Sequence, residues 1–279
     1  MYEMIFLWAL ALIWIIFATI QDLKTREIAN WLNFSLIIFA LGFRFFYSLF
    51  ASDSFVFFYQ GLIGLVIFFF IGNMLYYGRM FAGGDAKLMI ALGAVLPFSG
   101  NFSDNLKIFA SFLLIFLFIA AFYSLIFSLV LALKNFKSFR KEFNRRVKKY
   151  KKIVYSVMLL GLVLMAFGLF ETLFFSIGIL VFILPYFYIY AKAVDETSMI
   201  KKISTRKLVE GDWLYKDLKI GSKKIKARWE GLRKEEITRI RKRYKEILVR
   251  QGIPFAPVFL ISFLILIYFW KSGLWNSLW

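Results

Sequence analysis

The sequence contains no histidine and no cysteine among its 279 residues. These two absences exclude a serine–histidine–aspartate triad, a cysteine nucleophile, and any zinc or haem site that needs histidine or cysteine ligands. Without cysteine there are no disulfide bonds, so the composition leaves the redox compartment open. Any catalytic chemistry must therefore use carboxylates, lysines, tyrosines or hydroxyl groups.

Charged residues are also sparse, at 19% of the chain, whereas hydrophobic residues make up 61% and aromatic residues 21%. The mean hydropathy of +0.71 lies well above that of soluble globular proteins. This composition is typical of a membrane protein that crosses the bilayer several times. We therefore expect an all-α polytopic fold.

Apolar runs of about 17 to 25 residues are long enough to cross a hydrocarbon core. The run 153–194 is too long for one helix, and Glu171 and Thr172 near its middle offer a place to turn, so we interpret it as two spans. A shorter run begins at Ala86. The predicted total is about eight transmembrane helices, in the runs 4–20, 32–50, 55–77, from 86, 107–133, 153–194 (two) and 255–270.

Lysine and arginine predict the orientation, because they accumulate in short cytoplasmic loops. The loops after the first, third and fifth spans are basic, and the last of these holds ten basic residues within 134–152. The segments 51–54, 97–105 and 170–172 contain none. A single span over 153–194 would export the 18 basic residues of 195–250, which also favours two spans. Both termini are then predicted to lie outside.

Two aspartates, Asp22 and Asp85, fall on the same predicted cytoplasmic face of the membrane. A carboxylate near a bilayer is costly unless it is solvated or paired, so this placement suggests a function. Each residue taken singly could be an ordinary charge at a helix end. Taken together, with their local sequences, they indicate a catalytic pair.

Those local sequences carry a resemblance. The segment 22–32 begins with Asp22, continues through a basic stretch, and contains Ile28-Ala29-Asn30. It resembles the cytoplasmic loop of type IV prepilin peptidases and archaeal preflagellin peptidases, with alanine in place of a proline. The segment Ala82-Gly83-Gly84-Asp85-Ala86-Lys87 resembles the GxGD-x-K signature of the same aspartyl proteases, with Ala82 in place of the first glycine.

The resemblance continues into the segments 208–212, 231–232 and 250–257, which look like the archaeal branch. That branch usually has six spans, so 153–194 would be an additional hairpin. We expect a catalytic core at 1–133, a basic cytoplasmic segment at 134–152, the hairpin at 153–194, a small α+β cytoplasmic domain at 195–252 and a last helix at 253–279. Within that domain, 213–220 and 223–227 predict a hairpin, and 234–249 predicts a helix.

Two carboxyl groups that share a proton can activate a water molecule against a peptide bond. Asp22 and Asp85 would exchange the roles of base and acid, and the sequence does not say which one holds the proton. Gly83 and Gly84 would let a substrate backbone approach and would tolerate positive φ. Lys87 would orient Asp85 or lower its pKa, or simply anchor the helix. No cofactor or metal is implied, and without cysteine we expect no methyltransferase activity.

Other charges and glycines have simpler explanations. Arg44 lies near the outer end of its apolar run, where we expect its side chain to reach the headgroups. Gly61, Gly64 and Gly72 predict close helix packing. The formal charge of +19 is explained by cytoplasmic loops next to anionic lipid, and we expect no nucleic-acid partner. The basic segment at 134–152 has only Glu142 against its ten positive charges, so we expect it to lie along the headgroups. The resemblance implies substrates with basic leader peptides, so we do not expect this segment to attract them.

The resemblance implies a multi-pass cell-membrane endopeptidase with its active site facing the cytoplasm. Its partner would be a membrane-anchored archaellin or pilin-like precursor with a basic leader peptide. The main alternative is an ion- or proton-coupled transporter, although the second half of the chain lacks a counterpart of the aspartate segments. A presenilin-like protease would need a Pro-Ala-Leu motif that this chain lacks. A structural assembly protein is the remaining alternative.

Overall fold

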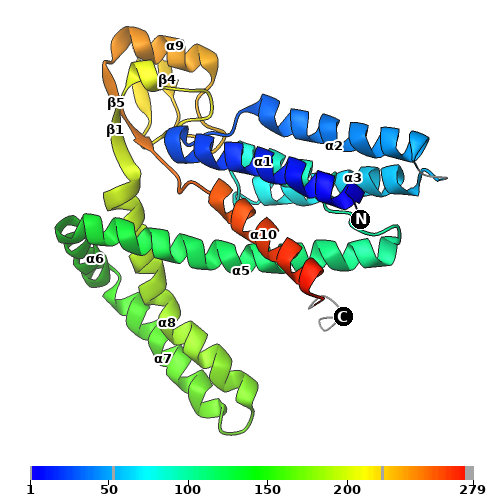
Figure 1. The fold of residues 1–279 in the computed structure, drawn as a ribbon. Helices are drawn as coiled ribbons and strands as arrows, with labels where there is room; N and C mark the ends of the chain where they lie inside the picture. The colour runs from blue at the N-terminus through cyan, green and yellow to red at the C-terminus, as the bar shows by residue number, and fades with distance from the viewer. Residues whose placement is uncertain (1, 52–53, 221–222, 274–279) are drawn as a thin grey trace. The chain divides into compact units, whose positions relative to one another are not determined.

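A computed structural model describes residues 2–51, 54–220 and 223–273 (Figure 1). The chain forms two compact units, one made of Met1–Ser124 with Ile253–Trp279 and the other of Leu125–Gly252. Each unit has its own helices. The sheets of the described chain lie in the second unit.

The first unit is a helical bundle in which long apolar sequences form continuous helices. Pro257 is compatible with this because it lies in the first turn of α10. Helix α1 packs against α2 and α10, and α2 packs against α3 (Figure 1). Helix α5 begins in this unit and continues into the second. The helices are α1 (Tyr2–Thr25), α2 (Asn30–Phe50), α3 (Val56–Tyr77), α4 (Gly83–Gly93), α5 (Phe102–Lys134) and α10 (Ala256–Ser272).

Helix α4 packs against α2 and α3, and most of its side chains are buried. A Cβ atom at Gly64 of α3 would lie 2.2 Å from the carbonyl oxygen of Gly93, and one at Gly72 would lie 2.9 Å from that of Ala86. The two backbones therefore touch at both ends of α4. The prediction that Gly64 and Gly72 permit close helix packing is confirmed.

Several helices can cross a membrane, and the chain is a multi-pass membrane protein. Within the described residues, five helices are long and apolar enough by length and composition, and a bent pair of helices would make a sixth. Helix α4 has 11 residues and is about 16 Å long, roughly half of a hydrocarbon core. Helix α10 has only 17 residues. The predicted total of eight spans is therefore not confirmed.

The second unit begins with the end of α5 and continues with three helices (Figure 1). Helices α7 and α8 pack side by side, with α8 beginning at Thr172, where the sequence suggested a turn. A Cβ atom at Gly161 would lie 2.7 Å from the backbone nitrogen of Phe182, so the two backbones are in close contact. The helices are α6 (Phe136–Lys149), α7 (Lys151–Phe167) and α8 (Thr172–Val194), followed by a π-helical turn at Asp195–Met199.

The remainder of this unit contains a three-stranded antiparallel sheet in the order β1-β5-β2 and a separate β3-β4 hairpin. Trp213 stacks on Trp229 with ring centroids 4.4 Å apart. The elements are β1 (Ile200–Ser204), β2 (Trp213–Leu214), β3 (Leu218–Ile220), β4 (Lys223–Ile225), α9 (Lys234–Arg243) and β5 (Glu246–Arg250).

Two local predictions in this region need correction. The helix predicted over 234–249 ends at Arg243, and 246–250 is the central strand β5. Ile247 and Val249 are buried there while Leu248 is exposed, a period of two that favours a strand once partners are available on both sides. The predicted hairpin forms only between β3 and β4, because β2 pairs with β5 instead. Its turn at 221–222 lies outside the described residues.

Candidate active site

Asp22 lies in the last turn of α1 and is 6% exposed. The backbone N–H of Ala256 donates a hydrogen bond of 2.8 Å to its Oδ2 atom, and the backbone of Phe255 also interacts with the carboxyl group. Phe255 is the N-cap of α10 and Ala256 is its first residue, 234 residues from Asp22 along the chain. The N-terminus of a helix carries unpaired N–H groups and partial positive charge, so it stabilises a carboxylate.

Asp85 occupies the first turn of α4 and is 9% exposed. Its carboxyl group accepts a hydrogen bond from the backbone of Ala82 and interacts electrostatically with the carboxyl group of Asp22. The structure therefore brings together the two aspartates that the sequence singled out. Asp85 lies at the N-terminus of its own helix, α4. Asp22 lies against the N-terminus of α10.

The segments that carry these aspartates touch each other at Gly84. A Cβ atom at Gly84 would lie 3.2 Å from the Cβ of Ile28, and the Asn33 Nδ2 atom donates to the Gly84 carbonyl over 3.4 Å. Next to this contact, Lys87 Nζ donates a hydrogen bond of 2.6 Å to Asn30 Oδ1. Lys87 thus links α4 to the start of α2.

The positive φ considered for the two glycines is not found, and their contact with a substrate stays a prediction. Gly83 and Gly84 form the first turn of α4, and neither is among the described glycines with positive φ. Their backbone conformation is therefore not the reason for glycine. Gly84 allows the chain itself to approach closely, whereas a Cβ at Gly83 would meet only the Tyr76 ring at an ordinary 3.8 Å.

Two arginines flank the site in an unusual backbone conformation. Arg26 follows α1 with φ of 63°, and Arg79 follows α3 with φ of 61°; within the described ranges they are the non-glycine residues with positive φ. The left-handed region costs a side-chain-bearing residue free energy, and such residues cluster at functional sites. Here they reverse the chain just after Asp22 and just before Asp85.

Arg44 differs from its sequence prediction, because it does not reach the headgroups. Its side chain is 0% exposed, and its guanidinium lies 4.4 Å from the centroid of the Phe57 ring. It donates hydrogen bonds to four backbone carbonyls, at 2.9 Å to Ala94, 2.9 Å to Phe57, 3.1 Å to Val95 and 2.7 Å to Pro97. Three of these follow the C-terminal end of α4, where a cation is favoured. The prediction from its position near the end of an apolar run was wrong because the loop 94–97 packs over Arg44 and supplies carbonyl partners for it.

A cluster of phenylalanine rings closes one side of the site. Phe81 lies just before α4, and its ring centroid is 5.7 Å from those of Phe116 and Phe255 and 6.0 Å from that of Phe259. These rings come from α5 and the start of α10. They provide an apolar wall beside the backbone donors of Asp22. With 36 phenylalanines in the chain, no sequence signal distinguished these four.

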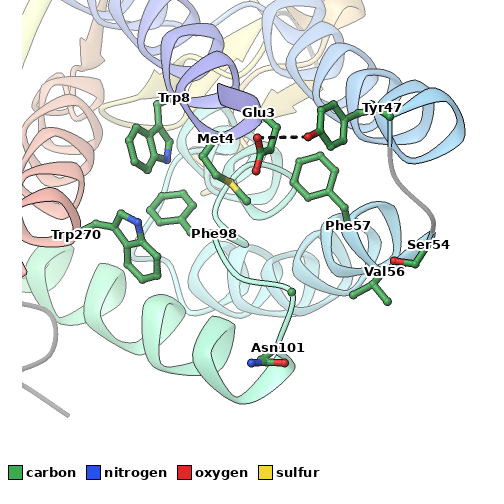
Figure 2. Close-up of a pocket in the computed structure, with 12 residues that line it drawn as sticks. Glu3, Met4, Trp8, Tyr47, Ser54, Val56, Phe57, Phe98, Asn101 and Trp270 are labelled. Carbon is green, nitrogen blue, oxygen red and sulfur yellow. Dashed lines mark hydrogen bonds between the residues drawn. The ribbon is translucent and has the colours of Figure 1, made fainter. Parts of the chain in front are cut away.

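A cavity of about 770 Å³ lies at the other end of α1. Figure 2 shows Glu3, Trp8 and Tyr47 around it, with the Tyr47 hydroxyl hydrogen-bonded to Glu3 over 3.4 Å. Glu3 is 19 residues before Asp22 on the same helix, about 28 Å away along its axis. This cavity is therefore separate from the aspartate pair. Within the described ranges, no group of three acidic residues that could hold a metal ion is found.

Sequence comparison places part of this chain beside known proteins. Residues 9–129, which include Asp22 and Asp85, match the type IV leader peptidase family. The preflagellin peptidase of Methanocaldococcus jannaschii is 35% identical over 83 residues, which are 30% of this chain and 35% of that protein. Those of Methanococcus maripaludis and Methanococcus voltae are 32% identical over 83 residues and 29% identical over 90 residues.

The aligned segments span 35% to 38% of the length of these relatives, so the similarity concerns one region of each protein. No solved structure matches the chain. Helix α10, which supplies the donors to Asp22, lies outside the matched residues. Over residues 9–129, the resemblance to archaeal preflagellin and prepilin peptidases that the two motifs predicted is confirmed.

Proposed function

We propose that this protein is a membrane aspartyl endopeptidase that removes the leader peptide of archaellin or type IV pilin-like precursors. One observation carries the proposal. The carboxyl groups of Asp22 and Asp85 interact in the buried core of the segment that matches the type IV leader peptidase family. The names of the matched relatives support a preflagellin-type substrate.

In this mechanism the pair holds one proton, because two adjacent carboxylates do not both ionise readily. We assign that proton to Asp85 in the resting enzyme, since the Ala256 N–H at the start of α10 donates a hydrogen bond that favours the Asp22 carboxylate. The Asp22 carboxylate then takes a proton from water as the water oxygen attacks the peptide carbonyl carbon. Asp85 gives its proton to the carbonyl oxygen.

The tetrahedral intermediate collapses when the C–N bond breaks. The leaving amine takes the proton held by Asp22, and Asp85 regains a proton from the hydroxyl that becomes part of the new carboxylic acid. The leader is released with a free carboxyl group and the mature subunit with a free amine. The aromatic cluster at Phe81 and Phe255 would limit the access of bulk water to this exchange.

Gly83, Gly84 and Lys87 have different parts in this scheme. Gly83 has no close neighbour beyond the Tyr76 ring, so it is the position where an extended substrate backbone can approach Asp85. Gly84 and Lys87 act through Ile28 and Asn30, which hold the two aspartate segments together. Lys87 is therefore a positioning residue in this proposal.

The site is proposed to face the cytoplasm, because basic residues gather at the same ends of the helices. Lys24 and Arg26 follow Asp22, and Arg79 and Lys87 flank Asp85, whereas the loop at 97–105 has no lysine or arginine. The substrate would be a membrane-anchored precursor that presents its basic leader on this side. The chemistry needs no cofactor.

The test is cleavage of archaellin and pilin-like precursors by the full chain in proteoliposomes, with mass spectrometry of both products. Asp22→Asn and Asp85→Asn should each lower the rate by about 10³-fold or more, since each removes an acid–base group. Asp104→Asn is the matched control, because Asp104 binds Ser99 and Asn101 at the start of α5. Wild-type cleavage by either of the first two variants would refute the aspartate pair.

A further inference from the structure

Helix α6 has two chemically different faces. Lys137, Arg140, Lys141, Lys148 and Lys149 are exposed. The opposite side carries Phe139, Phe143 and Val147, which are half-buried. Phe139 packs on Tyr190 of α8 with ring centroids 5.7 Å apart, and Phe143 stacks on Tyr186 at 6.5 Å. A cationic face opposite an aromatic one is the pattern of helices that lie in the membrane interface.

The direction of α6 agrees with that pattern. It meets α7 at an angle of 77° across a break at Tyr150 (Figure 1). Helix α7 is apolar over most of its length, so it fits along the membrane normal, whereas seven of the 14 residues of α6 are basic. If α7 crosses the bilayer, α6 lies nearly parallel to the membrane plane.

A groove of about 490 Å³ opens beside the aromatic face of α6. Its walls come from the end of α5, from α6 and from α8, and include Leu129, Leu133, Phe136, Ile183 and Phe187. All five are apolar and are exposed large hydrophobic side chains, as is Ile153 at the start of α7. The groove is therefore suited to a hydrocarbon chain rather than to a polar ligand.

Arg140 is four residues after Phe136 and three before Phe143, so on the helix surface it borders two residues that line the groove. The protein does not neutralise the cations on this side of α6. The acidic residue of α6, Glu142, pairs with Arg145 and Arg146 at 2.7 Å each. Over the described part of the chain, no ion pair involves Lys137, Arg140 or Lys141. Their i, i+3, i+4 spacing places the three side chains on one face of the helix, where a single phosphate can reach them.

We propose that α6 and this groove bind one anionic membrane lipid, with its phosphate at Lys137, Arg140 and Lys141 and a hydrocarbon chain in the groove. Charge complementarity identifies the headgroup, and the apolar lining identifies the rest of the molecule. A basic leader peptide would be repelled by the same three residues. The inference does not depend on the proposed peptidase activity.

The experiment is native mass spectrometry of the purified full chain in mild detergent, with added phosphatidylglycerol or phosphatidylcholine. The wild type should retain one phosphatidylglycerol in preference to phosphatidylcholine. The triple variant Lys137→Gln, Arg140→Gln, Lys141→Gln should bind it on the order of 100-fold more weakly, because each basic residue near an anionic lipid contributes separately. Lys201→Gln, Lys207→Gln, Lys219→Gln makes the same charge change at exposed positions and should bind like the wild type.

A second variant tests the groove. Ile183→Trp fills it from an exposed position on α8, so it should weaken lipid binding while circular dichroism shows unchanged helix content. Glycerol phosphate, which has the headgroup phosphate without a chain, should compete only at far higher concentration than the lipid. Equal binding of the two lipids, equal loss in both triple variants, or equal competition by glycerol phosphate would overturn the proposal.

Discussion

The two units of this protein differ in whether their charged side chains are buried or exposed. In the first unit Asp22, Asp85 and Arg44 are buried, and each is held by backbone groups. In the second unit the lysines of α6 are exposed, and a pair such as Lys202 and Glu246 remains largely open to water. A buried charge is costly and must be compensated in the fold, whereas an exposed one costs little.

The buried charges therefore fix the positions of helices and side chains, whereas the exposed charges are available to interact with another surface. Arg44 binds carbonyls after one end of α4, and Asp85 lies in the first turn at the other end. The position of the carboxyl group therefore depends on a cation at the opposite end of an 11-residue helix. The basic residues of α6 have no comparable effect on the fold, and substitutions in the two units should differ accordingly.

The largest effect is expected at Arg44. Arg44→Met leaves four backbone carbonyls without their donor, so it should lower the free energy of unfolding by about 3 to 5 kcal/mol and reduce precursor cleavage. The free energy of unfolding of Arg44→Lys should lie between those of the wild type and Arg44→Met. A lysine ammonium group keeps the charge but lacks the planar set of donors of a guanidinium group. Arg239→Met, at an exposed position on α9, is the control. Thermal unfolding in detergent measures the stability of each variant. Equal stability of Arg44→Met and Arg239→Met would contradict the expected difference between buried and exposed cations.

The next effect concerns the packing that supports these buried groups. Gly64→Ala places a Cβ atom 2.2 Å from the Gly93 carbonyl oxygen and must push α3 away from α4, at a cost of about 1 to 3 kcal/mol. Gly42→Ala is a matched control in α2, because nothing lies within 4 Å of its added Cβ. That variant should be neutral or slightly stabilising, since alanine favours helix.

Melting curves of the two alanine variants test this expectation directly. Cleavage should also fall in Gly64→Ala, because α4 carries Asp85. If both variants melt at the wild-type temperature, the contact between α3 and α4 does not limit stability.

Local patterns were sufficient to predict much of this molecule. The apolar runs predicted the long helices, and the glycines of α3 predicted its close approach to α4. The two aspartates were found from their short motifs, although their catalytic role stays a prediction. Each of these signals is contained within a few residues of sequence.

The features that were missed depend on contacts between distant residues. The Ala256 N–H is a backbone group, so no residue type at that position identifies it as a donor to Asp22. Three of the four carbonyls that accept from Arg44 lie in a loop about 50 residues away. The segment 246–250 becomes a strand because β1 and β2 pair with it on both sides. In each case tertiary contacts outweigh the local pattern.

A smaller effect is expected at the link between Lys87 and Asn30, which is partly open to water. Lys87→Met and Asn30→Ala should each lower stability modestly, and a double-mutant cycle should give a coupling of about 1 kcal/mol. If Lys87 only positions Asp85, Lys87→Met should lower kcat and leave KM nearly unchanged. A rise in KM alone would instead favour direct contact with substrate. Strictly additive stability effects would contradict the link.

The smallest effect is expected for carboxyl groups of the second unit, where water limits every electrostatic gain. Burial raises the pKa of Asp212, although the Val209 N–H bonds its carboxylate, whereas Lys224 holds the pKa of Asp217 below its usual range. A raised folded-state pKa gives a contribution that is present at acidic pH and is lost as the pH rises. A lowered folded-state pKa gives a contribution to stability that is present at neutral pH and is lost on acidification.

Asp212→Asn should therefore stabilise the protein slightly at neutral pH, by less than about 1 kcal/mol, and Asp217→Asn should destabilise it. Fluorescence melting at pH 7.5 and pH 4 should show both differences shrinking toward acid, and differences of the same sign would show that burial does not set these two carboxyl groups apart.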